Sequence, residues 1–279
     1  MQATILLFFS PFAKLPKGAC HILVNCLPKR ACHILVSGGL FLILSLGAQA
    51  ASPDWEAYRK SGHRSPNWNS LVESGFTAFD SGNWSTASNF LQRAYSKGCR
   101  DGLLLFKLGA YQEYLKEYSK AISLLQEAHK PLKKNYPDHE LTRSYHEHLG
   151  RIYYETNNYK EAKPHLVTAI QEMGENFMRL FMLGQILRME KDWPQAIKAF
   201  EKSLKYEPPP IPNQDPRVLV MLELMKIHNE TENFDAALQV ANQILVFDPQ
   251  NPIANQYKKQ IEQRKFQEKQ NEAMKEMIR

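Results

Sequence analysis

A pattern of spaced residues recurs along this chain, and it limits the possible folds more than any other feature of the sequence. Four copies begin with a glycine, at Gly75, Gly109, Gly150 and Gly184, and the glycines lie 34, 41 and 34 residues apart. In each copy an aromatic residue follows after nine positions, an alanine after twelve, a large apolar residue after sixteen and a small residue after nineteen. A fifth copy begins at Met225, 41 residues after the fourth. Chance does not readily produce five such matches, so the chain is expected to repeat one structural unit.

Each unit is expected to be a pair of antiparallel helices joined by a short polar turn. Apolar residues at helical spacing stand on both sides of every turn, and the small residues allow the two helices to approach closely. A single pair cannot bury its apolar face alone, but five stacked pairs form a continuous core and curve into a superhelix with a concave inner surface. In the fifth copy Met225 replaces the glycine and Ala241 stands at the large position, so this copy is expected to pack less regularly.

The sequence resembles the tetratricopeptide repeat family over residues 67–250. The resemblance rests on Leu108-Gly109, Leu149-Gly150 and Leu183-Gly184, on the repeated alanines, and on the closing prolines Pro208 and Pro249. It implies an all-α fold, a right-handed superhelical solenoid of about five helix-turn-helix repeats with a C-terminal capping helix. The repeats are expected at residues 67–101, 102–135, 143–176, 177–210 and 218–251. Two proline-containing insertions, around residues 130–138 and 208–216, are expected to be loops or bent joints, because proline disfavours helix.

Residues 1–50 have the three-part pattern of an export signal. Lys29 and Arg30 precede a nearly uncharged apolar run at 31–47, which ends in Ala48-Gln49-Ala50. This pattern predicts a cleaved signal sequence with a cut near Ala50 and Ala51, and therefore an exported protein, periplasmic or secreted. The alternative is an uncleaved inner-membrane anchor at 31–47, since a run of about 17 residues lies at the lower limit for spanning a bilayer. Residues 51–66 are expected to be a linker or a short added helix.

The charge distribution argues against nucleic acid as the partner. The whole chain has a formal charge of +6, but residues 1–50 carry four basic and no acidic residues, which leaves only +2 for the remainder. Residues 252–279 are expected to form a charged helix whose first half caps the array. Contact of this helix with a membrane or nucleic acid is the weaker alternative, because glutamates alternate with its basic residues.

No residue pattern indicates catalysis, a metal or a cofactor. His146 and His148 would face different sides of a helix, so they are not expected to share a metal ion. Cys99 is expected to be a buried small apolar residue. Carboxylates at helical spacing, such as Glu113 and Glu117, are expected on solvated faces. We therefore predict no enzymatic activity, no catalytic or metal-binding residues and no cofactor.

The resemblance also implies where a partner would bind. In this family the first helix of each pair lines the concave surface, at positions one after the glycine, three before it, and four or five after it. A core position remains the alternative for each aromatic residue among them. The residues selected in this way are Phe76, Phe79, Phe106, Tyr114, Arg151, Tyr154, Phe181 and Arg188.

The sequence thus favours a non-enzymatic interaction scaffold or adaptor of the bacterial cell envelope, which binds a peptide or partner helix in this groove. The acidic tails of cytosolic chaperones are disfavoured ligands, because the first repeat has Val72 and Phe76 where the family members that bind them have Lys and Asn. The alternative function is a membrane-anchored structural subunit or spacer of an envelope complex, with membrane contact only if the signal segment stays uncleaved.

Overall fold

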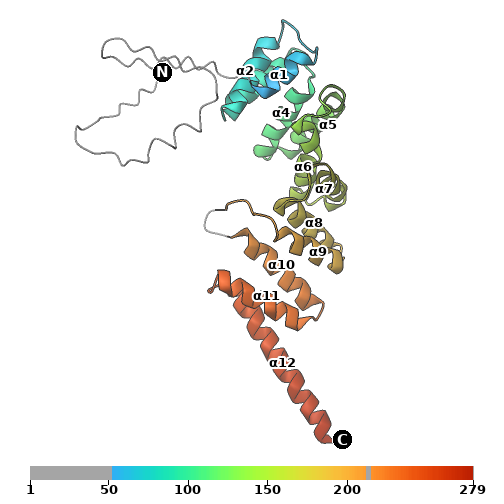
Figure 1. The fold of residues 1–279 in the computed structure, drawn as a ribbon, viewed down its shortest axis with the longest axis vertical. Helices are drawn as coiled ribbons and strands as arrows, with labels where there is room; N and C mark the ends of the chain where they lie inside the picture. Colours follow the sequence, from blue (N-terminus) through green and yellow to red (C-terminus); the bar gives the residue numbers. More distant parts are fainter. Residues whose placement is uncertain (1–51, 212–214, 279) are drawn as a thin grey trace, which may run out of the picture. The chain divides into compact units, whose positions relative to one another are not determined.

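The computed structural model describes residues 52–211 and 215–278, so the expectations for residues 1–50 lie outside it. Within these ranges the chain forms twelve α-helices (Figure 1). They are α1 (Pro53–Lys60), α2 (Asn69–Asp80), α3 (Trp84–Ser96), α4 (Gly102–Tyr114), α5 (Tyr118–Asn135), α6 (Glu140–Glu155), α7 (Tyr159–Met173), α8 (Phe177–Met189), α9 (Trp193–Ser203), α10 (Pro216–Glu230), α11 (Phe234–Phe247) and α12 (Pro252–Ile278). None of these described helices is long and apolar enough to cross a membrane.

The helices α2 to α11 form five consecutive pairs. The largest contacts are within the pairs α2 with α3, α4 with α5, α6 with α7, α8 with α9, and α10 with α11, and each pair also packs on the next (Figure 1). The all-α solenoid of helix-turn-helix repeats predicted from the sequence is confirmed.

The five turns within the pairs share one backbone conformation. The residue seven positions after the first template position has a positive φ in every repeat: Gly82 (74°), Lys116 (61°), Asn157 (58°), Lys191 (61°) and Glu232 (58°). The next residue in the chain precedes the second helix as its N-cap. A left-handed residue reverses the chain within a few positions, so each repeat sets its two helices against each other in the same way.

The template glycines allow the two helices of a pair to approach closely. A Cβ atom on Gly75 would lie 2.4 Å from a methyl carbon of Leu91, and one on Gly184 would lie 2.7 Å from the ring of Phe200. In the fifth repeat Met225 and Ala241 are both fully buried in one cluster. The large and small side chains have therefore exchanged helices, so the fifth pair departs from the glycine-to-large-residue packing of the other four while both positions stay buried.

Residues 130–135 of the first proline-containing insertion are helical, which corrects the expectation of a loop or bent joint there, whereas 136–138 lie in the connection to α6. Helix α5 continues through Pro131 to Asn135, and Leu132 is fully buried. A Cβ on Gly102 would lie 2.6 Å from the backbone nitrogen of Leu132, so helix α4 starts directly against this part of α5. The burial of Leu132 and this close backbone contact compensate for the hydrogen bond that proline cannot donate. In the second insertion the described residues 208–211 and 215 are not helical, and α10 begins at Pro216.

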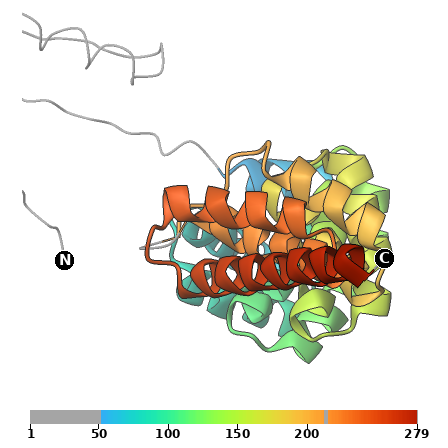
Figure 2. The same ribbon diagram turned by 90° about the horizontal axis from the view of Figure 1, so that it is seen from below.

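Additional helices cover both ends of the array. The stretch 51–66 contains α1, whose Trp55 and Tyr58 are buried against the first repeat. At the other end α12 packs beside α11 (Figure 2). Ala254 and Ile261 of α12 are buried. These contacts cover the last core face, as predicted for a capping helix. Beyond Ile261 the helix is largely exposed.

Candidate partner-binding surface

The first helices of the repeats line the inner side of the array. Helices α4, α6, α8 and α10 contact one another in succession, whereas the second helices in the described ranges make no contact of that extent with one another. The side on which successive helices lie closer together is the concave side of a curved stack. This is the face that the resemblance implied.

Ion pairs join successive helices along this inner face. Each pair links a helix to the first helix of a neighbouring repeat, and most of the paired side chains are largely buried. The pairs are Asp54–Lys107 (2.5 Å), Glu113–Arg151 (2.6 Å), Glu147–Arg179 (2.8 Å) and Glu223–Arg188 (2.9 Å). Much of the charge on the inner face therefore connects the repeats.

Glu113 lies at the centre of one such group. Its carboxylate accepts a hydrogen bond from Nε of Arg151 at 2.6 Å and lies 2.5 Å from Nδ1 of His148. Burial alone would raise the pKa of Glu113, but hydrogen bonds from His148 and Arg151 outweigh it and hold the pKa below its ordinary value. The expectation that Glu113 lies on a solvated face is wrong, because its side chain is only 9% exposed.

Two of the predicted contact residues, Phe76 and Phe106, belong to the core. Phe76 is fully buried and packs against the ring of Tyr58, and Phe106 is 1% exposed beneath the ring of His148. In both cases a neighbouring helix covers the position, α1 over Phe76 and α6 over Phe106. Neither side chain is available to a partner in this structure.

Three other predicted residues are half-buried and lie further along the inner face. Tyr154 packs against Tyr159, Phe181 against Phe200, and Arg188 pairs with Glu223. None of the three lines the open hollow that the remaining predicted residues form.

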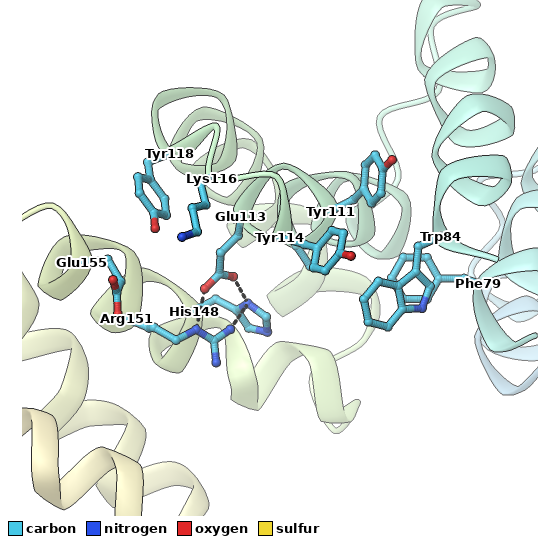
Figure 3. Close-up of a pocket in the computed structure, with 11 residues that line it drawn as sticks. Phe79, Trp84, Tyr111, Glu113, Tyr114, Lys116, Tyr118, His148, Arg151 and Glu155 are labelled. Atoms are coloured by element: carbon cyan, nitrogen blue, oxygen red, sulfur yellow. Dashed lines mark hydrogen bonds and ion pairs between the residues drawn. The ribbon is translucent and has the colours of Figure 1, made fainter. Parts of the chain in front are cut away.

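The remaining predicted residues, Phe79, Tyr114 and Arg151, line one open hollow of about 560 Å³ (Figure 3). Tyr114 lies between an aromatic end, formed by Phe79 and Trp84, and a charged end, formed by Glu113, His148 and Arg151. The other residues around the hollow are Ala110, Tyr111, Lys116, Tyr118 and Glu155.

Trp84 is the most informative residue that the sequence reasoning missed. It occupies the aromatic position of the template and was therefore assigned to the repeat skeleton. Its indole is nevertheless 43% exposed, whereas the equivalent residues Tyr118, Tyr159, Trp193 and Phe234 are half-buried. Trp84 lies 5.1 Å from the ring of Tyr114 and 6.3 Å from that of Phe79. The equivalent residue starts the second helix in every repeat, so no signal in the sequence marks Trp84 as the exposed one.

The residues considered as metal ligands or as a nucleophile have surroundings that indicate structural roles. His146 lies 2.9 Å from Nδ1 of His165 on α7, whereas His148 faces Glu113 on α4, so the two histidines point to different neighbours as expected. Cys99 is 1% exposed, and burial raises the pKa of its thiol to about 11, which disfavours the nucleophilic thiolate. Within residues 52–211 and 215–278 no three or more His, Cys, Asp or Glu side chains are grouped to hold a metal ion.

Comparison with known families agrees with this architecture. Residues 102–171 and residues 178–210 each match a sequence profile described as tetratricopeptide repeat. The matched segments are tetratricopeptide repeats. Arrays of these repeats are scaffolds for protein interactions. No match to a curated protein was found.

Several solved tetratricopeptide repeat structures share the fold. PilF of Pseudomonas aeruginosa is 14% identical, with a TM-score of 0.52 over 70% of this chain and 82% of PilF. MamA of Desulfovibrio magneticus RS-1 is also 14% identical, with a TM-score of 0.51 over 67% of this chain and 98% of MamA. YrrB, described as having an unusual peptide-binding site, is 16% identical, with a TM-score of 0.55 over 75% of this chain and all of YrrB. At these identities the similarity shows the fold alone.

Proposed function

We propose that this protein is a non-enzymatic adaptor that binds a polypeptide partner in the hollow on its inner face. The observation that carries the proposal is the group of accessible rings, Trp84 and Tyr114, beside an ion-paired cluster on a curved repeat array. Exposed aromatic residues in a concave site supply large contact area at low entropic cost, which is typical of protein recognition. The near balance of charge beyond residue 50 favours a protein over a nucleic acid as the partner.

Site-specific photo-cross-linking in cells tests this proposal. A photoreactive phenylalanine analogue at Tyr114 is expected to capture a defined partner polypeptide. The matched control carries the same analogue at Gln126, an exposed position on the second helix α5. Equal capture at both positions, or none at Tyr114, would contradict binding through the hollow.

We further propose that the protein works outside the cytoplasm of a bacterium, in the cell envelope. The support is the basic, apolar and small-residue pattern of residues 1–50. Amino-terminal sequencing of the protein from cells is the test. A start at Ala51 supports an exported adaptor, whereas an intact leader in the inner-membrane fraction supports the alternative, a membrane-anchored structural subunit. A cytoplasmic protein with an intact leader would contradict both.

A further inference from the structure

The aromatic end of the hollow is held in a fixed arrangement and is open to solvent. Trp84 is 43% exposed and Tyr114 is 63% exposed, and their rings are perpendicular at an interplanar angle of 86°. Phe79 stacks on Trp84, and Tyr111 stacks on Tyr114, each with ring centroids 6.3 Å apart. These supporting rings orient the exposed ones, so a ligand would lose little entropy in ordering them.

The hollow offers hydrogen-bond donors that can reach the carbonyl groups of a peptide. The indole N–H of Trp84 can only donate, the hydroxyl of Tyr114 can donate or accept, and both side chains are exposed. The side chain of Arg151 is 40% exposed, and Lys116 is exposed at the edge of the hollow. The carboxylate of Glu113 already interacts with His148 and Arg151 through its two oxygens. Glu155, which is exposed, is the other carboxylate around the hollow.

The exposed rings and the indole N–H of Trp84 select among extended peptides. A proline-rich segment brings carbonyl acceptors but few N–H donors, and its flat apolar rings pack well on aromatic side chains. It is also held in the polyproline II conformation before binding, which reduces the entropic cost.

The charges around the hollow disfavour a strongly acidic ligand. Lys116 and Arg151 are opposed by Glu113 and Glu155, so the formal charges of these four side chains cancel. A neutral ligand suits this balance better than a polyanion does.

We propose that the hollow between Trp84, Tyr114 and Arg151 binds a proline-rich segment of a partner protein in the polyproline II conformation. Proline rings pack in the angle between Trp84 and Tyr114, and the indole N–H of Trp84 donates to a peptide carbonyl. The inference rests on the proposed function and specifies the chemistry of the partner.

Fluorescence anisotropy of a labelled polyproline peptide with the purified protein tests the proposal. A peptide of about ten residues spans ~30 Å in this conformation. Binding is expected to saturate, and Gly-Ser and Glu-rich peptides of equal length are expected to bind at least about tenfold more weakly, a difference of about 1.4 kcal/mol. Equal binding of the three peptides, or stronger binding of the acidic one, would overturn the proposal.

Substitutions of the exposed rings test whether the polyproline peptide binds in the hollow. Trp84→Ala and Tyr114→Ala are each expected to weaken polyproline binding about tenfold or more. Trp84→Phe, which keeps a ring but removes the donor, should have an intermediate effect. The matched control is Phe266→Ala, which removes a 64% exposed ring on α12 and should not change binding. Circular dichroism verifies that each variant is folded, and unchanged affinity in folded Trp84→Ala and Tyr114→Ala would refute the assignment.

The two proposals fail in different ways. If a partner is captured at Tyr114 but no polyproline peptide binds, the protein is an adaptor of another specificity and only this inference is wrong. If neither occurs, the hollow is not the binding surface and both proposals are wrong.

Discussion

The exchange of Met225 and Ala241 in the fifth repeat gives a quantitative test of how the helix pairs pack. Both residues are fully buried, and in the other repeats the same two positions hold a glycine and a large side chain. Met225→Gly should cost about 3–6 kcal/mol, from loss of a buried side chain and from glycine within a helix. Ala241→Leu should cost about 1–3 kcal/mol by overpacking against Met225.

The double variant restores the arrangement of the first four repeats and approximately conserves the total side-chain volume. Its loss should therefore be about 2–3 kcal/mol, which is mainly the cost of glycine and of imperfect repacking. The two single losses add to about 4–9 kcal/mol, so we expect a favourable coupling energy of at least ~1 kcal/mol.

Native-state hydrogen exchange of amides in α10 and α11 is the direct assay, because it measures the free energy of opening of this repeat. Urea unfolding followed by circular dichroism complements it, although a repeat array need not unfold in a single step. If the double variant loses as much stability as the two single variants together, within ~0.5 kcal/mol, the two side chains do not compensate for each other and the explanation is wrong.

Three further changes have expected outcomes that unfolding experiments can measure. Gly102→Ala should destabilise the protein by about 1–3 kcal/mol, despite better helix propensity, because the new Cβ meets the backbone of Leu132; an unchanged melting temperature would contradict this. Glu113 has a lowered pKa in the fold, so its contribution is present above pH 4.5 and is lost as the pH falls through the folded value. Glu113→Gln should flatten that part of the pH dependence of unfolding, and an unchanged acid profile would count against it. Lys191→Gly, at φ 61°, should stabilise by up to about 1 kcal/mol, and destabilisation would show that the left-handed turn is not strained.

The sequence predicted the repeat architecture because the residues that determine it follow a fixed spacing. In each of the first four repeats a glycine packs against the large side chain sixteen positions later. This spacing indicates that the two helices approach closely. The turn conformation was less visible. Its left-handed position holds Gly, Lys, Asn, Lys and Glu in the five repeats, so the residue types do not share a signature. The packing of the two helices on either side of the turn, and not the residue type, imposes this conformation.

The candidate site was predictable only in part, because the position of a residue in the repeat template does not indicate which other helices cover it. Phe76 and Arg151 occupy the same position of the template, yet α1 covers Phe76 while Arg151 remains accessible. That covering helix lies in the stretch 51–66, which was expected to be a linker or a short added helix. The loop predicted around Pro131 was wrong for a similar reason. Tertiary contacts at Leu132 stabilise a helix that proline alone would end.

The charges on the inner face are a poor guide to the charge of a ligand, although the resemblance suggested that they contact it. The ionic side chains there pair mostly with one another from repeat to repeat, as Arg188 does with Glu223. A buried charge without a partner is costly, so a ligand that drew Arg151 away from Glu113 would leave that carboxylate uncompensated. Recognition by charge would therefore work against the contacts that join the repeats, whereas contact with Trp84 and Tyr114 breaks none of those ion pairs. For this reason we assign recognition to the aromatic rings.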